Sequence, residues 1–398
     1  MSVPDEEWRP RARKLAQELV AAGKLWSAQW REAVCAVPRH ALVPDVLRRE
    51  PDESWQRLDT STEQGRREWL DQVYSNTALL TAVAKGSPSG SLRSSSSMPG
   101  LMTRMLEALD VHDGDRVLEI GTGTGYNAAL LARRLGDQNV FSVDIEPDLI
   151  EAARQRLARI GYHPTLVAAD GAAGLAAYAP FERIIATCAV PAVPWAWVAQ
   201  TRPGGVILTD LKIAQGAGSL VRLIRHPDCA EGRFDPTYAA FMSLRHQPTG
   251  DAPDRPRPRR HPGKQPQERT TTLDPRTPWT SLVVWFLASF DLGPDIGLGY
   301  GRFQDGQPTV TSITTGDGSW AEVTLAADHG VHQVSEGGPR RVWQIIEKAH
   351  TLWTILGQPG WNRFGLTATA SEQYVWYDHP DSEHRWPLPT PPIPQPAG

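Results

Sequence analysis

The sequence predicts an α/β fold with a mostly parallel, doubly wound sheet, an N-terminal helical segment and a smaller C-terminal α+β domain. Strand-like and helix-like runs alternate between residues 116 and 210, which is typical of a parallel sheet covered by helices on both faces. Three glycines at two-residue spacing lie at the first strand-to-helix junction of this region. A stretch rich in proline and arginine then separates it from a tryptophan-rich C-terminal part. With 398 residues, the chain is long enough for two or three domains.

The N-terminal region, residues 1–98, is expected to be mainly helical. Apolar residues recur at helical spacing across residues 8–34. Two prolines interrupt this pattern in the segment Val37–Pro44. Residues 84–97 are rich in glycine, serine and proline, which predicts a loop in front of the next helix.

The central domain is predicted over residues 99–245. Pro99 begins an amphipathic helix through Leu109. We expect helices at residues 125–136 and 147–160, and parallel strands at residues 116–120, 139–144, 164–169, 182–187 and 204–210. Two further strand-like runs, residues 219–225 and 238–244, would close the sheet as an antiparallel pair and bring it to seven strands.

The stretch of residues 246–278 has almost no apolar residues and is expected to be a linker. Its arginines could contact nucleic acid, although a solvated linker is the interpretation that we favour. Residues 279–398 would then form the C-terminal domain, with a helix at 339–355 and strands at 281–287, 309–315, 320–325, 366–370 and 373–377. Eight of the 15 tryptophans lie at or after Trp279, and Trp361, Trp376 and Trp386 could form an aromatic face for peptide docking.

The most informative motif is Val-Leu-Glu-Ile-Gly-Thr-Gly-Thr-Gly at residues 117–125. Gly121, Thr122, Gly123 and Gly125 follow a buried strand and precede a helix, so their backbone amides would face an anionic group. The spacing differs from the G-x-G-x-x-G of dinucleotide sites, and no lysine follows as in a phosphate-binding loop. The motif therefore indicates S-adenosylmethionine, whose methionine carboxylate would lie at the glycines.

Acidic residues at the ends of three consecutive predicted strands support this cofactor. Glu119 is placed to meet the methionine ammonium, directly or through water. Asp144, followed by Ile145, is placed to accept hydrogen bonds from the ribose hydroxyls. Asp170 and Gly171 follow the third strand and are expected near the adenine. Together with the glycines, they predict a class I methyltransferase fold, a Rossmann-like and mostly parallel seven-stranded sheet.

At these motifs the chain resembles the protein-L-isoaspartate (D-aspartate) O-methyltransferases. The resemblance covers residues 10–245, about three fifths of the chain. The similar segments are the glycine motif through residue 132, Ala33–Pro44 with its Val-Pro-Arg turn, Ser97-Met98-Pro99 in place of the family's Ser-Gln-Pro, Asp170-Gly171, and Thr187–Pro194.

The departures from the family pattern resemble a peptide-tailoring branch of these enzymes. They are the methionine at position 98, the segment Thr187–Pro191 where the family has an alanine- and proline-rich loop, and about 150 extra residues. This resemblance implies methylation of an aspartate side chain in a ribosomally synthesised, modified peptide of lanthipeptide or graspetide type. Loss of methanol would then give an aspartimide and sometimes isoaspartate.

The expected reaction transfers a methyl group to a carboxylate oxygen and releases S-adenosyl-L-homocysteine. An aspartyl carboxylate, with a pKa near 3.9, is already ionised at neutral pH, so no general base or metal is required. A hydroxyl could hold one carboxylate oxygen while the other attacks. Ser97 is the candidate by the resemblance, with Ser96 and Ser95 as alternatives because the register within four serines is open. Ser97 could equally cap the helix that begins at Pro99.

Composition narrows the partners and leaves other functions open. A net charge of −4 gives no reason to expect nucleic acid, and no apolar run is long enough to span a membrane. Three widely spaced cysteines suit a reducing cytoplasm. We expect a monomer that acts on a modified peptide or, as the main alternative, on isoaspartyl proteins as a repair enzyme. A module that binds cofactor and peptide without catalysis, and a methyltransferase acting on small molecules or RNA, are further alternatives.

Overall fold

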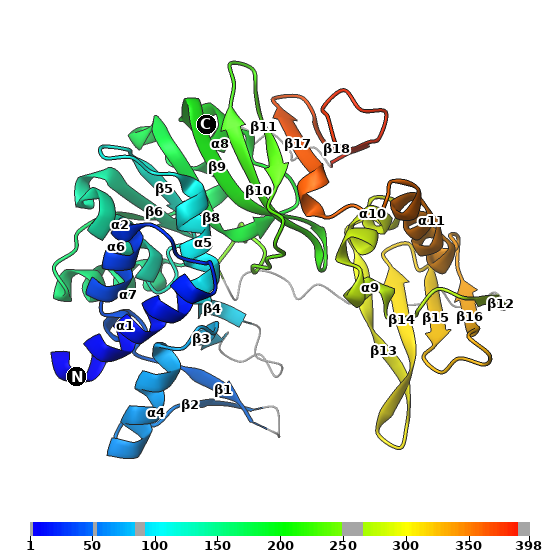
Figure 1. Cartoon of the computed structure of the whole chain (residues 1–398), viewed down its shortest axis with the longest axis horizontal. Helices are drawn as coiled ribbons and strands as arrows, with labels where there is room; N and C mark the ends of the chain where they lie inside the picture. The colour runs from blue at the N-terminus through cyan, green and yellow to red at the C-terminus, as the bar shows by residue number, and fades with distance from the viewer. Residues whose placement is uncertain (1–2, 51–53, 84–91, 249–265, 389–398) are drawn as a thin grey trace.

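A large mixed sheet forms the centre of the computed structural model, which describes residues 3–50, 54–83, 92–248 and 266–388 (Figure 1). Its strand order is β19-β18-β17-β11-β10-β9-β8-β5-β6-β7. The strands are β5 (Val117–Ile120), β6 (Val140–Asp144), β7 (Thr165–Ala168), β8 (Phe181–Val190), β9 (Thr201–Ala214), β10 (Ala217–Arg225), β11 (Cys229–Phe234), β17 (Phe364–Thr369), β18 (Gln373–Tyr377) and β19 (Arg385–Pro387).

The half of this sheet from β7 to β9 is parallel, as the sequence predicts. One face is covered by α5 (Pro99–Leu109), α6 (Tyr126–Leu135) and α7 (Pro147–Arg159), and the other by α8 (Trp195–Gln200) and α10 (Leu282–Leu292). Along β5, Leu118 and Ile120 lie on the α8 and α10 face, whereas Val117 packs toward α6. Because β5 is central and pairs with β6 on one side and β8 on the other, its carboxyl end is the switch point of the sheet.

The antiparallel half differs from the prediction in its last strand. Residues 219–225 lie within β10 as predicted, but residues 238–244 form no strand, and β11 is the strand that pairs with β10. A short turn closes this hairpin, in which the amide of His226 donates to the carbonyl of Cys229. Residues 238–244 are instead held beside the end of β8, where the amide of Ala189 donates to the carbonyl of Met242 at 2.8 Å.

The C-terminal region is not the single separate domain that the sequence predicts. Strands β17, β18 and β19 extend the central sheet from the open edge of β11, and Figure 1 shows β17 and β18 beside β11. The central sheet therefore has ten strands among the described residues, where seven were predicted. Pairing of a new strand with β11 satisfies backbone groups that an edge would leave exposed.

The remaining C-terminal residues form a module with a five-stranded antiparallel sheet in the order β12-β16-β15-β14-β13. Its strands are β12 (Gln267–Thr271), β13 (Ile296–Gln304), β14 (Gln307–Thr315), β15 (Trp320–Thr324) and β16 (His332–Gly337), and its further helices are α9 (Thr277–Thr280) and α11 (Val342–Ile355). The predicted linker thus includes a strand and a helix from residue 267 onward, while residues 249–265 lie outside the described part.

The predicted strand at residues 281–287 is wrong, because this run belongs to α10. Val284, Trp285 and Phe286 are fully buried, so the helix is apolar on every side and shows no period that would mark it as a helix. The indole of Trp285 donates to the carbonyl of Gln215 at 2.8 Å in the β9–β10 turn. The same apolar core continues from the central sheet through α10 into the module.

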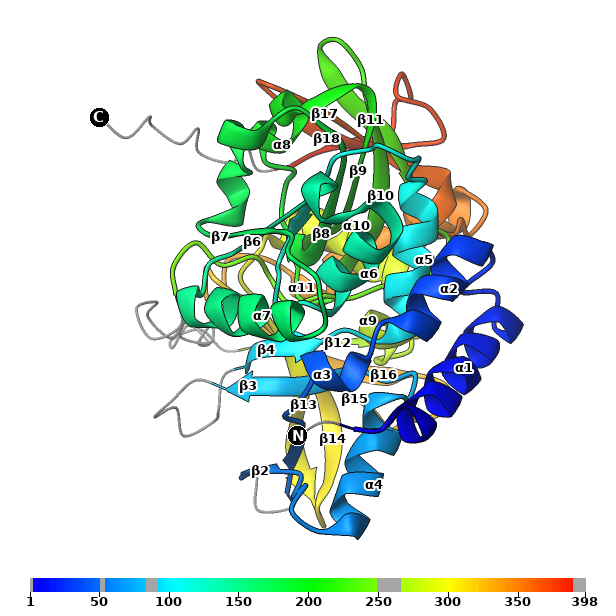
Figure 2. The same cartoon turned by 90° about the vertical axis from the view of Figure 1, so that its left-hand side faces the viewer.

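The N-terminal region combines helices with a small antiparallel sheet in the order β2-β1-β3-β4. Its elements are α1 (Asp5–Ala21), α2 (Ala28–Ala36), α3 (Arg39–Leu42), β1 (Leu47–Arg49), β2 (Trp55–Arg57), α4 (Glu63–Val73), β3 (Leu79–Val83) and β4 (Leu92–Ser96). The predicted loop at residues 84–97 is therefore a strand over its serine-rich end. Arg93 of β4 pairs with Asp148 at the start of α7, and Figure 2 shows β3 and β4 below that helix.

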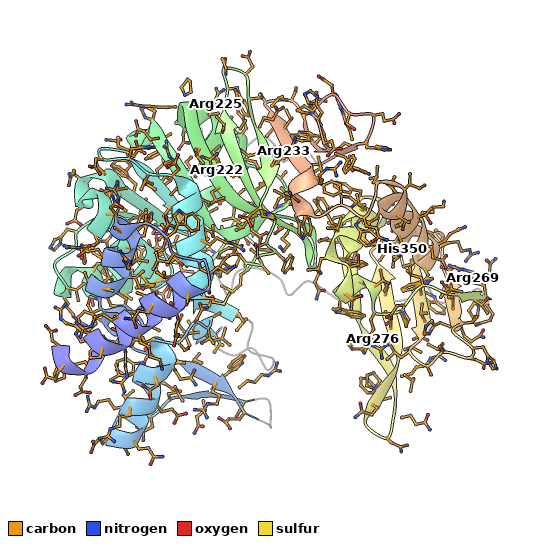
Figure 3. The ribbon with its side chains drawn as sticks, viewed as in Figure 1. Arg222, Arg225, Arg233, Arg269, Arg276 and His350 are labelled. Atoms are coloured by element: carbon orange, nitrogen blue, oxygen red, sulfur yellow. The ribbon has the colours of Figure 1, made fainter. Side chains whose placement is uncertain are left out.

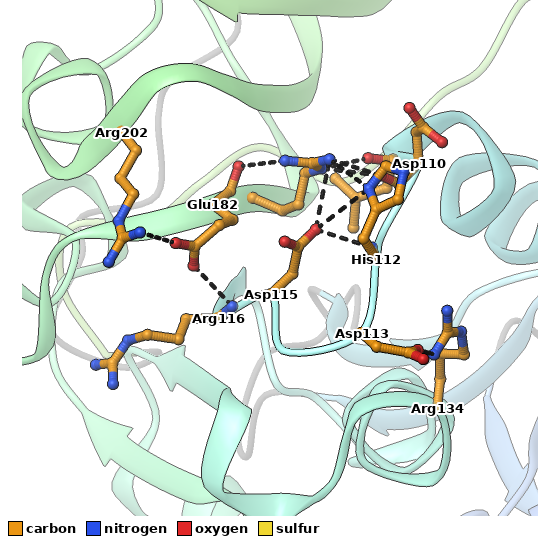
Figure 4. Close-up of polar contacts among 10 residues, drawn as sticks. Asp110, His112, Asp113, Asp115, Arg116, Arg134, Glu182 and Arg202 are labelled. Carbon is orange, nitrogen blue, oxygen red and sulfur yellow. Dashed lines mark hydrogen bonds and ion pairs between the residues drawn. The ribbon is translucent and has the colours of Figure 1, made fainter.

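Charged side chains away from the glycine motif mainly join elements of the fold. The β10–β11 hairpin carries Arg222, Arg225 and Arg233 (Figure 3). Each of these arginines donates to a backbone carbonyl of another element or turn. At the amino ends of β5 and β8, Glu182 accepts from the amide of Arg116 and pairs with Arg202 at 2.8 Å (Figure 4). No helix in the described ranges is both long and apolar enough to cross a membrane.

Candidate functional site

A cavity of about 520 Å³ lies at the carboxyl ends of β5, β6 and β8. This volume is in the range of small-molecule and cofactor sites. The lining comes from the glycine motif, the ends of β6 and β8, the serine-bearing strand β4, the first turns of α5 and residues 237–245. The topological switch point, where cofactors bind in doubly wound sheets, therefore carries the cavity.

The glycine motif forms one wall of this cavity because its backbone adopts conformations that other residues avoid. Gly121, Gly123 and Gly125 have φ values of +98°, +51° and +87°. A Cβ atom on Gly121 would lie 2.6 Å from Oγ1 of Thr187. That hydroxyl donates to the carbonyl of Gly121 at 2.8 Å, so β8 holds the loop directly.

Asp144 and Ile145 lie where the sequence predicts, at the end of β6 and in the cavity wall. One carboxylate oxygen of Asp144 accepts from the amide of Gly123 at 2.9 Å, and the other accepts from the amide of Glu146 at 3.1 Å. Burial raises the pKa of Asp144, while these two amide donors oppose that rise. The residue thus presents an anchored carboxylate beside the glycine loop.

Glu119 lies beneath the loop, and the cavity lining, as far as the described residues define it, excludes it. Its carboxylate accepts from the side-chain amide of Asn127 at 2.8 Å and from the hydroxyl of Ser142 at 2.5 Å. The hydroxyl of Thr122 lies 2.6 Å from that of Ser142, which extends the network into the loop. Strand alternation directs Glu119 toward α6, where its carboxylate supports the loop. Of the two predicted ways of meeting a cofactor ammonium, directly or through water, this burial disfavours the direct contact.

Asp170 supports the turn after β7, and Gly171 lines the cavity. One oxygen of Asp170 accepts from the amide of Ala172 at 2.9 Å, and the other lies 2.9 Å from Nδ1 of His246. Gly171 lines the cavity, and a Cβ atom there would lie 2.5 Å from a methyl group of Ile120. The indole of Trp197 donates to the carbonyl of Gly171 and fixes this turn.

The four serines lie at the end of β4 and just after it. Ser95 and Ser97 line the cavity, whereas Ser96 is outside the lining and binds Arg39. Ser94, which the sequence reasoning did not single out, also lines the cavity and is 3% exposed. Its hydroxyl has no hydrogen-bond partner in the described part of the chain, and it would lie 3.7 Å from a Cβ atom on Gly123. A serine-bearing strand therefore covers the glycine loop.

Arg39, from the Val-Pro-Arg turn, holds this strand in place. The guanidinium is fully buried and donates to the hydroxyl of Ser96 at 3.0 Å and to the carbonyl of Ser97 at 3.2 Å. It also donates to the carbonyl of Val73 at 2.7 Å and lies over the ring of Tyr126. Burial lowers the pKa of Arg39 to about 10, so it stays charged at neutral pH. Two sequence motifs separated by more than 50 residues thus form one structure.

The rest of the cavity lining contains residues that sequence reasoning missed. They include Lys24, Asn76, Arg104 and the segment 237–245. No local motif marks them, because helix packing and the course of the chain after β11 bring them together. Cys188 also lines the cavity, and burial raises the pKa of its thiol, which fits a packing role.

The residues present fit S-adenosylmethionine. Gly121 and Gly123 line the cavity with backbone that has positive φ, and Asp144 ends the second parallel strand beside them. Asp144 would hold the ribose, and Gly121 and Gly123 would receive the methionine part. In the described ranges no three or more His, Cys, Asp or Glu side chains are grouped to hold a metal ion.

Comparison with known proteins agrees with this geometry. The family model described as protein-L-isoaspartate (D-aspartate) O-methyltransferase matches residues 56–229. A relative from Ignicoccus hospitalis, named protein-L-isoaspartate O-methyltransferase, is 31% identical over 218 residues, which are 54% of this chain and 89% of the relative. One of the same name from Methylorubrum extorquens is 35% identical over 223 residues, covering 56% of this chain and 82% of the relative.

A solved structure described as protein-L-isoaspartate O-methyltransferase shares the fold. The superposition has a TM-score of 0.53 at 20% sequence identity, and it covers 92% of this chain and 100% of the other. Coverage of this extent requires most of residues 246–398 to be included. The likeness of fold therefore extends beyond the nucleotide-binding half into the C-terminal part.

Proposed function

We propose that this chain, which belongs to the protein-L-isoaspartate (D-aspartate) O-methyltransferase family, methylates the carboxylate of an aspartyl or isoaspartyl residue in the cavity beneath β4. The chain is a methyltransferase that uses S-adenosylmethionine. The observation that carries the proposal is the position of β4. A Cβ atom on Gly123 would lie 3.6 Å from the carbonyl oxygen of Ser95, so the serines adjoin the cofactor loop.

In this reaction the protein must bind the cofactor and the acceptor carboxylate, orient them toward each other and exclude water. When bound, S-adenosylmethionine supplies a methyl group on a positively charged sulfur. A carboxylate acceptor is already ionised at neutral pH, so the side chains need not remove a proton. We propose that Ser97 donates to one carboxylate oxygen and leaves the other free to attack. This hydrogen bond would align the free oxygen with the methyl group of the cofactor. Arg39 holds the carbonyl of Ser97 and so limits where that hydroxyl can point.

The finer proposal concerns the acceptor. The resemblance in the sequence favours an aspartate side chain of a modified ribosomal peptide, whose methyl ester loses methanol to a backbone amide and gives an aspartimide. Repair of isoaspartyl residues in proteins is the second candidate, because relatives that are 31% and 35% identical carry the name protein-L-isoaspartate O-methyltransferase. The extra residues do not separate the two candidates, because the solved structure shares the fold over 92% of this chain.

The tryptophan-rich part also changes the reasoning about peptide docking. Trp361 is 5% exposed and Trp376 is 3% exposed. Trp361 packs on Phe234 and Phe286, and Trp386 stacks on Phe290. Trp361 and Trp386 therefore pack at the junction of the central sheet with the module, whereas Trp376 lies on the other face of β18 beneath Arg233. The acceptor peptide is better sought at the cavity. We place the reaction in the cytoplasm and expect a monomeric enzyme.

The deciding experiment is mass spectrometry of matched peptides incubated with the protein and S-adenosylmethionine. The peptides differ only in carrying aspartate, isoaspartate or an aspartate within a modified cyclic precursor. A gain of about 14 Da at aspartate followed by a loss of about 32 Da supports tailoring, and methylation of isoaspartate alone supports repair. Absence of transfer to all three would refute the proposed function.

Variants of the three serines test the alignment role. Ser97→Ala is expected to lower kcat by roughly 10-fold or more, because one hydrogen bond to a charged acceptor is lost. Affinity for S-adenosyl-L-homocysteine should stay the same. Ser95→Ala should lower kcat less, and Ser96→Ala should act on stability through Arg39. A loss of cofactor affinity in Ser97→Ala would contradict this assignment.

A further inference from the structure

Arg104 is one of the cationic side chains of the cavity lining that the proposed function has not used. It belongs to α5 and has a side chain that is 10% exposed. A guanidinium at this depth has lost most of its water. It therefore needs hydrogen-bond acceptors from the protein or from a ligand.

The protein supplies little to this guanidinium. Within the described residues, neither Nε nor Nη2 of Arg104 has a hydrogen-bond partner. Its Nη1 lies 3.8 Å from a carboxylate oxygen of Asp235, which is outside hydrogen-bond range. That same oxygen already accepts from the amide of Thr237 at 2.8 Å. Arg104 thus offers two unused donors in a planar fork.

The position of Arg104 on α5 brings its fork toward the proposed transfer point. Side chains of an α-helix incline toward its N-terminus, so Arg104 leans toward Gly100 and the residues before it. Ser97 lies just before this helix, and all three line the same cavity. The first turn is fixed because the amide of Gly100 donates to Asn76 at 2.7 Å. Ser97 and Arg104 therefore reach the same cavity from the start of one helix.

We propose that Arg104 is a substrate-binding residue that pairs with the acceptor carboxylate and selects for its negative charge; this inference rests on the proposed function. A guanidinium can donate from two nitrogens to a single carboxylate oxygen, the one that Ser97 also holds, so the other oxygen stays free to attack. The transferred methyl group removes the charge of the carboxylate, so the ester is held less tightly than the acid. Arg104 would thereby favour the unmethylated residue and the release of the product.

Three arginines line the cavity among the described residues, and Arg104 is the one least engaged by protein carboxylates. Arg93 and Arg245 both pair with Glu146, whereas the carboxylate of Asp235 lies 3.8 Å from Nη1 of Arg104. Of these three arginines, Arg104 therefore has the most donor capacity left for a ligand carboxylate.

The test compares binding of two peptides that are identical except for one group, in the presence of S-adenosyl-L-homocysteine. One carries isoaspartate or aspartate, and the other carries the corresponding carboxamide. Calorimetry on the full chain should show roughly 10- to 100-fold tighter binding of the carboxylate peptide to the wild type. Arg104→Met should reduce this ratio to about threefold or less, and Arg104→Lys should restore part of it.

The control is Arg222→Met, which removes an arginine that donates to the carbonyl of Ala108 near the end of α5 but lies outside the cavity lining. It should retain the wild-type ratio. Discrimination that survives in Arg104→Met would overturn the inference and leave the proposed function standing. Loss of S-adenosyl-L-homocysteine binding in a folded Arg104→Met or Arg104→Lys variant would overturn it as well, by assigning Arg104 to the cofactor. A wild type that binds and methylates neither carboxylate peptide would overturn both.

Discussion

Replacing Glu119 by glutamine should change how the stability of the protein depends on pH. Glu119 is completely buried, and burial raises the pKa of its carboxyl from 4.5 to about 7 despite hydrogen bonds from Ser142 and Asn127. Below pH 4.5 the group is protonated in both the folded and the unfolded chain and favours neither. As the pH rises to about 7, the unfolded chain ionises freely while the folded chain must accept a buried charge.

The expected magnitude follows from these two pKa values. The interval from 4.5 to about 7 corresponds to about 3 kcal/mol of unfolding free energy, which the wild type loses across this window. Glutamine has the same shape and does not titrate. The free energy of unfolding of Glu119→Gln, minus that of the wild type, should therefore rise by about 3 kcal/mol between pH 4.5 and pH 8. Other titrating groups are common to both proteins and cancel in the difference.

Urea unfolding at half-unit pH steps, followed by circular dichroism, measures this difference. The control is Glu151→Gln on α7, where the side chain is exposed and hydrogen bonds from Gln155 and Arg154 lower the pKa of the carboxyl. A lowered pKa has the opposite sign, so the control should show no rise in this window. Parallel stability curves for Glu119→Gln and the wild type would refute the reasoning. Because Glu119 lies beneath the loop, the variant should also keep its affinity for S-adenosyl-L-homocysteine within about tenfold.

Three further substitutions test the parts of the site separately. Arg39→Met should cost about 2–4 kcal/mol in urea unfolding and lower kcat, because Ser96, Ser97 and Val73 lose a buried donor; unchanged stability would contradict this. Gly121→Ala should weaken S-adenosyl-L-homocysteine binding in calorimetry by more than about tenfold, since a methyl group would lie 2.6 Å from the Thr187 hydroxyl and φ is +98°. Asp144→Ala should weaken the same binding by roughly 10- to 100-fold through loss of a charged acceptor, and wild-type affinity would remove it from the cofactor site.

Local patterns predicted the parallel half of the fold because its signals are local. The strands β5 and β6 are apolar and are followed by α6 and α7, each with one apolar face, and these periods are visible in the sequence. The run at residues 281–287 has no period, since α10 is buried on all sides, and its helical state depends on the sheets around it. The pairing of β17 with β11 is equally invisible, because it joins segments far apart in the chain.

In the site, too, local patterns predict some residues, and contacts between distant segments determine others. Gly121, Gly123 and Asp144 are recognisable because their conformations or positions follow from the strand-to-helix junction. The direction in which the Glu119 side chain points depends on strand register. The place of Arg104 in the cavity lining depends on how α5 lies beside residues 237–245. Interactions between distant segments set both of these features, and no spacing in the sequence encodes them.

The pairing of β17 with β11 also bears on synthesis. Among the described residues, all that line the cavity precede residue 246, so a nascent chain contains them before the sheet that supports them is finished. The residues between Phe234 and Phe364 take on the order of ten seconds to translate at ~5–20 residues per second. During that interval the edge of β11 stays open beside the ribosome. Cofactor binding to the emerging protein would stabilise the parallel half while the last strands are still to be made.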